Sequence, residues 1–162
     1  MSWGGIAFFL KLLGNIAPAL GRLIRPDISG QWYFEYEIKR TEYNPYRGMR
    51  VQYVAELLCN KNGAVVGTSE KLRERVASGA VRSYTGRFRD QAKLQGQLRF
   101  GVKRFAWCLD LHVEERGEKR MHSAAQQLRI YDGGEKMLGS FFGTAANSEG
   151  EVLWKRDRFL NC

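Results

Sequence analysis

Alternation of apolar and polar residues with a period of two runs through most of this chain and constrains its fold more than any other feature. In residues 31–40, Trp, Phe, Tyr and Ile alternate with Tyr, Glu, Glu and Lys. Such alternation is typical of a strand with one buried and one solvated face. The pattern returns in further runs up to residue 158, separated by short turns. No connection is long enough for the helical crossover of a parallel sheet, so we expect an antiparallel meander.

We expect eight or nine strands. They are predicted at residues 31–40, 50–59, from 64–68 onward, 82–89, 93–100, 104–113, 119–131, 137–145 and 151–158. Asn62-Gly63 predicts a tight hairpin, and Asn147-Ser148-Glu149-Gly150 predicts the last turn. The polar stretch 69–78 fits either a helical turn or a solvated edge.

Three glycines recur at the centre of a short apolar motif, and they favour a closed sheet. By parity Gly86, Gly96 and Gly139 each lie on the apolar face of a strand. Glycine there lets a strand bend sharply, which is how a narrow barrel turns its corners, and closure removes edge strands. The predicted fold is therefore all-β: a small, lipocalin-like antiparallel β-barrel over residues 26–162, preceded by one N-terminal helix. A sandwich is the alternative architecture.

Residues 1–25 carry the second informative pattern. On a helical wheel the apolar side chains gather on one face, and Lys11, Asn15 and Arg22 lie on the other with small residues. The 19 residues from Ile6 to Ile24 would span about 28 Å as a helix, close to a hydrocarbon core. No charged region precedes the apolar run, which makes a signal peptide the weaker interpretation. We expect this helix to span a bilayer or to lie in its interface; docking on the barrel or on a partner is the alternative. The residues predicted to contact membrane are Phe8, Phe9, Lys11, Leu12, Leu13, Asn15, Ile16, Leu20 and Arg22.

Charge and cysteine content narrow the partner and the chemistry. The net charge is +9, which suits an anionic partner, whether nucleotide, nucleic acid or lipid headgroup, or merely a basic solvated surface. Three cysteines without short spacing do not form a disulfide framework. Cys108, Asp110 and His112 alternate on one strand face and could present metal ligands or a Cys–His pair, but surface positions fit them better. With no phosphate loop or nucleophile motif, we expect no catalytic residues, no metal, no cofactor and no enzyme activity.

Several short motifs together indicate a family. Ser29-Gly30-Gln31-Trp32 at the head of the meander is similar to the Gly-x-Trp start of lipocalin-like barrels. With the apolar N-terminal segment and the Asn147–Gly150 turn before Val152-Leu153-Trp154, the chain more closely resembles the two-transmembrane, β-strand-rich effectors (STING-like β-barrels) of bacterial cyclic-oligonucleotide anti-phage signalling, or CBASS. The similarity covers nearly the whole chain, although this chain has one apolar segment where the family usually has two.

The resemblance implies a barrel in the cytoplasm, attached to the bacterial inner membrane and its lipids. It implies that the barrel binds a cyclic di- or trinucleotide, assembles into homo-oligomers and disrupts the membrane, with no nucleic acid polymer as partner. A membrane-anchored, lipocalin-like binding protein for a small apolar ligand is the alternative function. An enzyme using Cys108 and His112 is a distant third.

A cyclic oligonucleotide presents purine faces and phosphates, which aromatic rings and Arg or Lys side chains recognise. Strand parity and strand ends nominate Tyr36, Tyr53, Arg82, Tyr84, Arg99, Lys103, Arg104, Trp107, Arg129 and Tyr131. The competing interpretation of each is a core aromatic ring or a solvated arginine.

Overall fold

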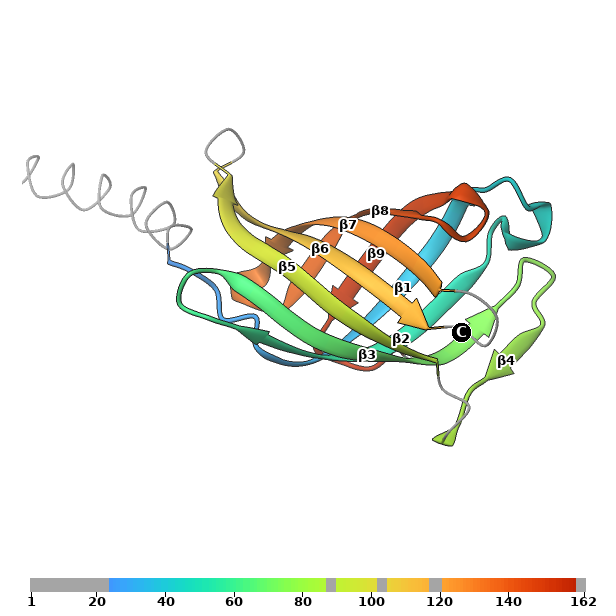
Figure 1. Ribbon diagram of the computed structural model, residues 1–162, viewed down its shortest axis with the longest axis horizontal. Coiled ribbons are helices and arrows are strands. Elements are labelled where there is room, and N and C mark those ends of the chain that lie inside the picture. The colour runs from blue at the N-terminus through green and yellow to red at the C-terminus, as the bar shows by residue number, and fades with distance from the viewer. Residues whose placement is uncertain (1–23, 87–89, 102–104, 117–120, 160–162) are drawn as a thin grey trace, which may run out of the picture.

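The computed structural model describes residues 24–86, 90–101, 105–116 and 121–159 (Figure 1). Their strands are β1 Gly30–Arg40, β2 Arg50–Cys59, β3 Ala64–Arg75, β4 Val81–Ser83, β5 Gln91–Gly101, β6 Ala106–Arg116, β7 Met121–Tyr131, β8 Lys136–Gly143 and β9 Ser148–Lys155. Single 3-10 turns occur at η1 Asn44–Tyr46, η4 Asp132–Gly134 and η5 Ala145–Asn147. The predicted membrane residues, from Phe8 to Arg22, lie outside the described residues, and Ile24 and Arg25 are not helical.

Eight of the strands close into a barrel. Each pairs antiparallel with its neighbours in the order β1-β2-β3-β5-β6-β7-β8-β9, and β9 pairs back to β1. β4 is the ninth strand and pairs only with the end of β3, outside the ring. The predicted all-β, antiparallel barrel is confirmed, and the alternative sandwich is wrong.

The barrel has two ends, each with its own set of turns. At the N-terminal end β1 begins and the β2–β3, β5–β6 and β7–β8 turns lie; in Figure 1 it is at the left, where the described chain starts. β4 and the β1–β2, β6–β7 and β8–β9 connections lie at the far end, at the right of Figure 1.

Three local predictions are wrong. Residues 69–75 are neither a helical turn nor a free edge, because they continue β3 and pair with β2 and β4. Of the predicted strand 82–89, only Arg82 and Ser83 are paired, as part of β4, and 87–89 lie outside the described residues. The last turn is formed by η5, so Ser148, Glu149 and Gly150 belong to β9, where pairing with β8 holds them extended.

Four strands each carry an inward-facing glycine that has no room for a side chain, at Gly67, Gly96, Gly139 and Gly150. A Cβ atom at any of them would overlap a backbone carbonyl oxygen of the neighbouring strand. Each therefore lets two neighbouring strands approach closely. The prediction for Gly96 and Gly139 is confirmed; that for Gly86 is wrong, since Gly86 lies outside the strands with a φ of 57° and open space around it.

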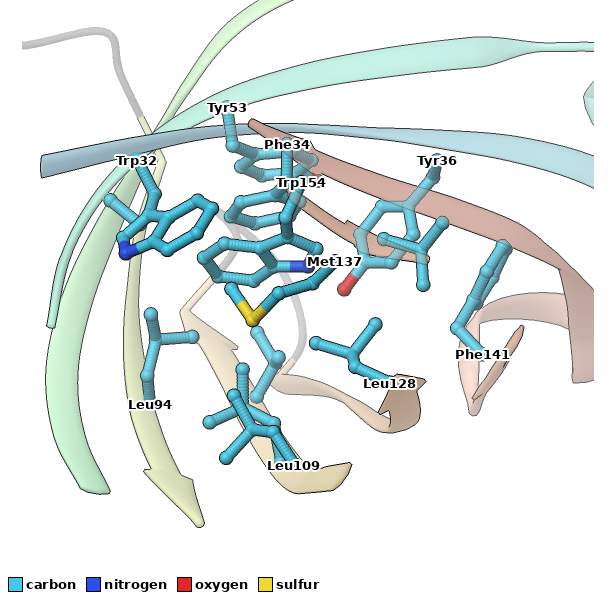
Figure 2. Close-up of a cluster of buried hydrophobic side chains, with 14 of the residues drawn as sticks. Trp32, Phe34, Tyr36, Tyr53, Leu94, Leu109, Leu128, Met137, Phe141 and Trp154 are labelled. Atoms are coloured by element: carbon cyan, nitrogen blue, oxygen red, sulfur yellow. The ribbon is translucent and has the colours of Figure 1, made fainter. Parts of the chain in front are cut away.

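Aromatic side chains fill the lumen (Figure 2). Phe34 is stacked between Tyr53, 4.6 Å away between ring centroids, and Trp154, 4.2 Å away. Trp154 donates a hydrogen bond of 2.9 Å to Gln126, which donates one of 2.6 Å to the Tyr36 hydroxyl. An eight-stranded barrel is just wide enough for side chains to fill it, and each large side chain buried here stabilises the fold by about 1.5–3 kcal/mol.

Candidate ligand-binding site

The arm, residues 24–29, lies at the N-terminal end of the barrel and contacts the β2–β3 and β7–β8 turns. Ile28 is fully buried, and its carbonyl oxygen accepts a hydrogen bond of 2.8 Å from the Trp32 indole. The guanidinium of Arg156, at the end of β9, lies 3.9 Å from the Trp32 ring. Arg156 also donates hydrogen bonds of 2.9–3.2 Å to the carbonyl oxygens of Asp27, Ser29 and Gln31. The cation–π contact and these three bonds fix the arm to the barrel wall.

A second arginine fixes the start of the arm. Arg25 donates hydrogen bonds to the carbonyl oxygens of Asn60 and Lys61 and one of 2.9 Å to the sulfur of Cys59, all at the β2–β3 turn. On the other side Gly134 packs closely against the arm, where an added Cβ would lie 3.2 Å from the Asp27 carbonyl oxygen. The arm is thus held between two turns of the barrel.

A cleft of about 620 Å³ opens between the arm, the β5–β6 turn and the β7–β8 turn. Its walls are residues 24–27, 105–107 and 129–134. This volume falls within the usual range for small-molecule sites. Three aromatic side chains and two arginines line the cleft: Phe105, Trp107, Tyr131, Arg25 and Arg129.

Two features of the cleft point to a ligand. The indole nitrogen of Trp107 is buried and has no hydrogen-bond partner, and leaving such a donor unsatisfied costs about 1–3 kcal/mol. Phe105 is exposed at a φ of 46°, a left-handed conformation that is costly for a phenylalanine. A ligand that offers an acceptor to Trp107 and a flat surface to Phe105 would satisfy the first group and use the second.

The far end of the lumen holds a charged cluster of a different kind. The Lys71 ammonium lies 3.5 Å from Glu74, 3.7 Å from Asp90 and 4.0 Å from Glu115, and Tyr53 donates a hydrogen bond of 3.2 Å to Glu115. Burial raises the pKa of the Glu115 carboxyl, and Lys71 offsets part of that rise. Burial opposes the charged form of Lys71, but its acidic neighbours, Glu115 foremost, raise its pKa. Three carboxylates around one lysine would repel a phosphate, so this cluster does not suit an anionic ligand.

The predicted ligand residues divide between the two ends. Trp107, Arg129 and Tyr131 line the cleft, and the Arg129 guanidinium lies 5.4 Å from the Tyr131 ring. Arg99 lies nearby on the outer face of β5, in an ion pair of 2.6 Å with Asp110. Lys103 and Arg104 lie outside the described residues.

The other four predicted residues lie at the far half of the barrel. Tyr36 and Tyr53 are buried in the aromatic core. Tyr84 lies 5.0 Å from the Lys71 ammonium, and Arg82 is exposed and forms an ion pair of 3.5 Å with Glu74. The structure therefore does not bring the ten residues into one site.

Sequence reasoning missed Ile24, Arg25 and Phe105 as cleft residues. Ile24 and Arg25 were assigned to the end of a helix, and Phe105 to the start of a strand. Pro26-Asp27 was taken as the end of the helix, and because proline disfavours a helical conformation in the residue before it, the pair could also have indicated that Arg25 belongs to an extended arm.

The residues considered for metal binding or nucleophilic chemistry lie on the outer face of β6. His112 is exposed, 3.6 Å from Glu114, and Asp110 pairs with Arg99. Leu109, which alternates with them on the same strand, is fully buried. Within the described part of the chain, no group of three His, Cys, Asp or Glu side chains could hold a metal ion.

These features define a closed, eight-stranded antiparallel β-barrel with a cleft beside its N-terminal arm. No protein-family model and no curated protein matches the chain. Among solved structures, a de novo designed fluorescence-activating β-barrel is similar, with a TM-score of 0.49 and 9% sequence identity over 85% of this chain and 97% of the design. No helix among the described residues is both long enough and apolar enough to cross a membrane.

Proposed function

We propose that this chain is a non-enzymatic effector at the bacterial inner membrane whose barrel binds a cyclic di- or trinucleotide in the cleft beside the arm. Binding would promote self-association of the chain and disruption of the membrane, as its resemblance to the CBASS effectors implies. The observation that carries the proposal is the cleft itself: aromatic rings, two arginines and an unsatisfied indole N–H meet in a volume suited to a small ligand.

The chemistry of the cleft matches the parts of such a ligand. Purine faces can stack on Phe105 or Tyr131, and a phosphate can accept charge-assisted hydrogen bonds from Arg129. The Trp107 N–H can donate to a phosphate or base oxygen. Base stacking on an aromatic side chain contributes about 1–3 kcal/mol per base.

The position of the cleft supports a link between ligand and membrane segment. Residues 24–27 form one wall, and they follow directly on the apolar residues 1–23. Arg25 is bound to three groups of the β2–β3 turn. A phosphate in the cleft would compete for this guanidinium and so loosen the hold on the arm.

The alternative, a carrier for a small apolar ligand, has less support. Such a carrier needs an apolar cavity in the lumen, and there the stacked rings of Tyr53, Phe34 and Trp154 occupy the middle of the barrel. Copurified lipid detected by native mass spectrometry would favour the carrier.

The direct test is binding of a panel of cyclic di- and trinucleotides to the full chain in detergent, by thermal shift and calorimetry. A ligand at about 100 times its dissociation constant adds roughly 2.7 kcal/mol of stability, which for a domain of this size raises Tm by about 5–10 °C. We expect Arg129→Ala to weaken binding by about tenfold or more, the loss of one charge-assisted hydrogen bond.

The matched control is Arg40→Ala, which removes the same charge from an exposed side chain at the far end. The absence of binding to every nucleotide in the panel would refute nucleotide sensing. Binding that survives Arg129→Ala unchanged would refute the cleft as the site. Ligand-dependent dye release from vesicles then tests membrane disruption separately.

A further inference from the structure

Residues 24–29, which follow directly on residues 1–23 in the sequence, are fixed to the barrel. Ile24 is followed at once by Arg25, which binds the β2–β3 turn, and by residues 26–29, which Arg156 holds. Ile28 is already in the core. If residues 1–23 enter a bilayer, as the proposed function requires, the N-terminal end of the barrel lies against that bilayer. The far end then lies about 25 Å away, the rise along the barrel axis of an eleven-residue strand tilted by about 40°.

That end is ringed by exposed apolar side chains. The exposed fractions are 73% for Ile24, 62% for Leu58, 52% for Val66, 42% for Phe105 and 38% for Tyr131. Leu58 and Val66 are paired across β2 and β3, so their side chains form one continuous apolar patch on the outer face. Tyr43, Val81, Met121 and Phe142 are exposed toward the far end, so apolar exposure alone does not select an end. The arm selects the N-terminal end, because residues 25–29 are bound there.

Basic residues surround this apolar ring. The segments at the N-terminal end are residues 24–29, 58–66, 99–101, 105–107, 129–138 and 155–156. They carry seven Lys or Arg residues (Arg25, Lys61, Arg99, Arg129, Lys136, Lys155 and Arg156) against three acidic ones (Asp27, Asp132 and Glu135). Apolar and aromatic side chains among basic residues are the composition that binds the headgroup region of anionic bilayers.

We infer that the N-terminal end of the barrel is itself a docking face for an anionic lipid surface. Leu58, Val66 and Phe105 enter the boundary between headgroups and acyl chains, and Lys61 and Lys136 contact lipid phosphates. Because Phe105 also lines the cleft, a ligand bound there would alter the docking face directly. The sensing site and the bilayer contact are then adjacent surfaces of one rigid body.

The test uses the full chain with an environment-sensitive nitrobenzoxadiazole label on single cysteines. The background is Cys59→Ser, Cys108→Ser, Cys162→Ser, with folding checked by circular dichroism. Labels at Leu58→Cys and Val66→Cys report the docking face, and a label at Phe142→Cys, equally outward but at the far end, is the control. Vesicles contain phosphatidylcholine with or without phosphatidylglycerol, and no nucleotide is present.

We expect emission from positions 58 and 66 to rise by about twofold or more, with a blue shift, on vesicles with phosphatidylglycerol, and emission from position 142 to stay constant. Lys61→Glu with Lys136→Glu should lower the response to that on neutral vesicles. The inference would be overturned if the chain binds vesicles while emission from positions 58 and 66 stays constant, or if emission changes equally at all three positions. A chain that does not bind vesicles would also overturn it. Since Lys61 and Lys136 lie outside the cleft, the charge-reversed variant should bind nucleotide normally, so docking and sensing can fail independently.

Discussion

Replacing Gly139 by alanine should destabilise the barrel through a single methyl group. Gly139 faces the lumen from β8, opposite Leu128 of β7. An added Cβ would overlap the carbonyl oxygen of Gln127 and lie 2.8 Å from its carbonyl carbon and 3.0 Å from the Cα of Leu128. All three atoms are backbone, so no side-chain rotation can relieve the overlap. β7 and β8 must move apart at the point where they approach most closely.

The cost can be assembled from its parts. Overpacking a dense interior costs about 1–3 kcal/mol. Stretching one or two of the β7–β8 backbone hydrogen bonds adds roughly 0.5–1.5 kcal/mol each. The lower chain entropy of unfolded alanine offsets about 0.4–1 kcal/mol. We expect the free energy of unfolding to fall by about 2–4 kcal/mol, which lowers Tm by roughly 6–12 °C for a domain of this size.

Urea unfolding followed by circular dichroism measures the change, with Gly101→Ala as the matched control. Gly101 also lies in a strand, but a Cβ there would be 3.4 Å from its nearest neighbour, the Ala106 carbonyl oxygen, which is ordinary contact. The control should stay within about 0.5 kcal/mol of the parent or be slightly more stable. Equal stability of Gly139→Ala and the parent, or equal loss of stability in both variants, would refute the argument that the barrel needs glycine at position 139 for β7 and β8 to approach closely.

Three further substitutions test the interior and the charged cluster. Gln126→Leu leaves the two aromatic hydrogen-bonding groups that flank it buried and unpaired, and should cost about 2–4 kcal/mol in urea unfolding. Arg156→Ala removes the cation over Trp32 and three carbonyl contacts, and should cost about 2–3 kcal/mol and speed hydrogen exchange in the arm. Glu115→Gln should gain stability relative to the parent as pH rises from about 4.5 toward 7, measured by urea unfolding at both values.

The sign of the pH effect follows from the raised pKa of Glu115. The folded state binds the proton more tightly than the unfolded state, so the stability that the protonated carboxyl contributes is lost as pH rises through the folded pKa. A neutral glutamine does not suffer this loss, and Lys71, whose pKa is raised, stays charged throughout. A stability difference between Glu115→Gln and the parent that is constant with pH would contradict the assignment.

Each of these substitutions has a neighbour of the same type that is exposed. Gln127→Leu, Arg158→Ala and Glu114→Gln are the respective controls, and each should change stability by about 0.5 kcal/mol or less. A control that costs as much as its partner would show that the effect does not depend on the buried contacts described above.

Most strands of the barrel could be predicted from the sequence, because apolar and polar residues alternate within each strand and turn residues separate the strands. Residues 50–59 were predicted as a strand, and β2 has the same bounds. The second half of β3 escaped because Lys71 and Glu74 are charged yet face the lumen at the far end. A register shift between Gln52 and Tyr53, where β2 pairs with β3, also interrupts the period of two that the prediction relied on.

The candidate site was predicted only in part, for a geometric reason. Parity identifies the face of a strand but not the height of a residue along the barrel axis, so Tyr36 and Tyr53 were grouped with Trp107 although they lie in the core. The cleft also depends on Arg25 binding the β2–β3 turn, a contact between residues 34 to 36 positions apart. No local pattern encodes that contact.

β4 determines where this barrel can add a foreign strand. The eight ring strands pair on both sides, whereas β4, among the described strands, pairs with β3 alone and leaves one edge open. That edge is only three residues long and carries Arg82 at its centre, a short and charged edge of the kind that discourages runaway pairing. Fibril-like growth through the wall is therefore blocked all round the ring. Among the described strands, a strand from another molecule can pair only with the open edge of β4, at the far end of the barrel. A peptide that bound there would extend the sheet without opening the barrel.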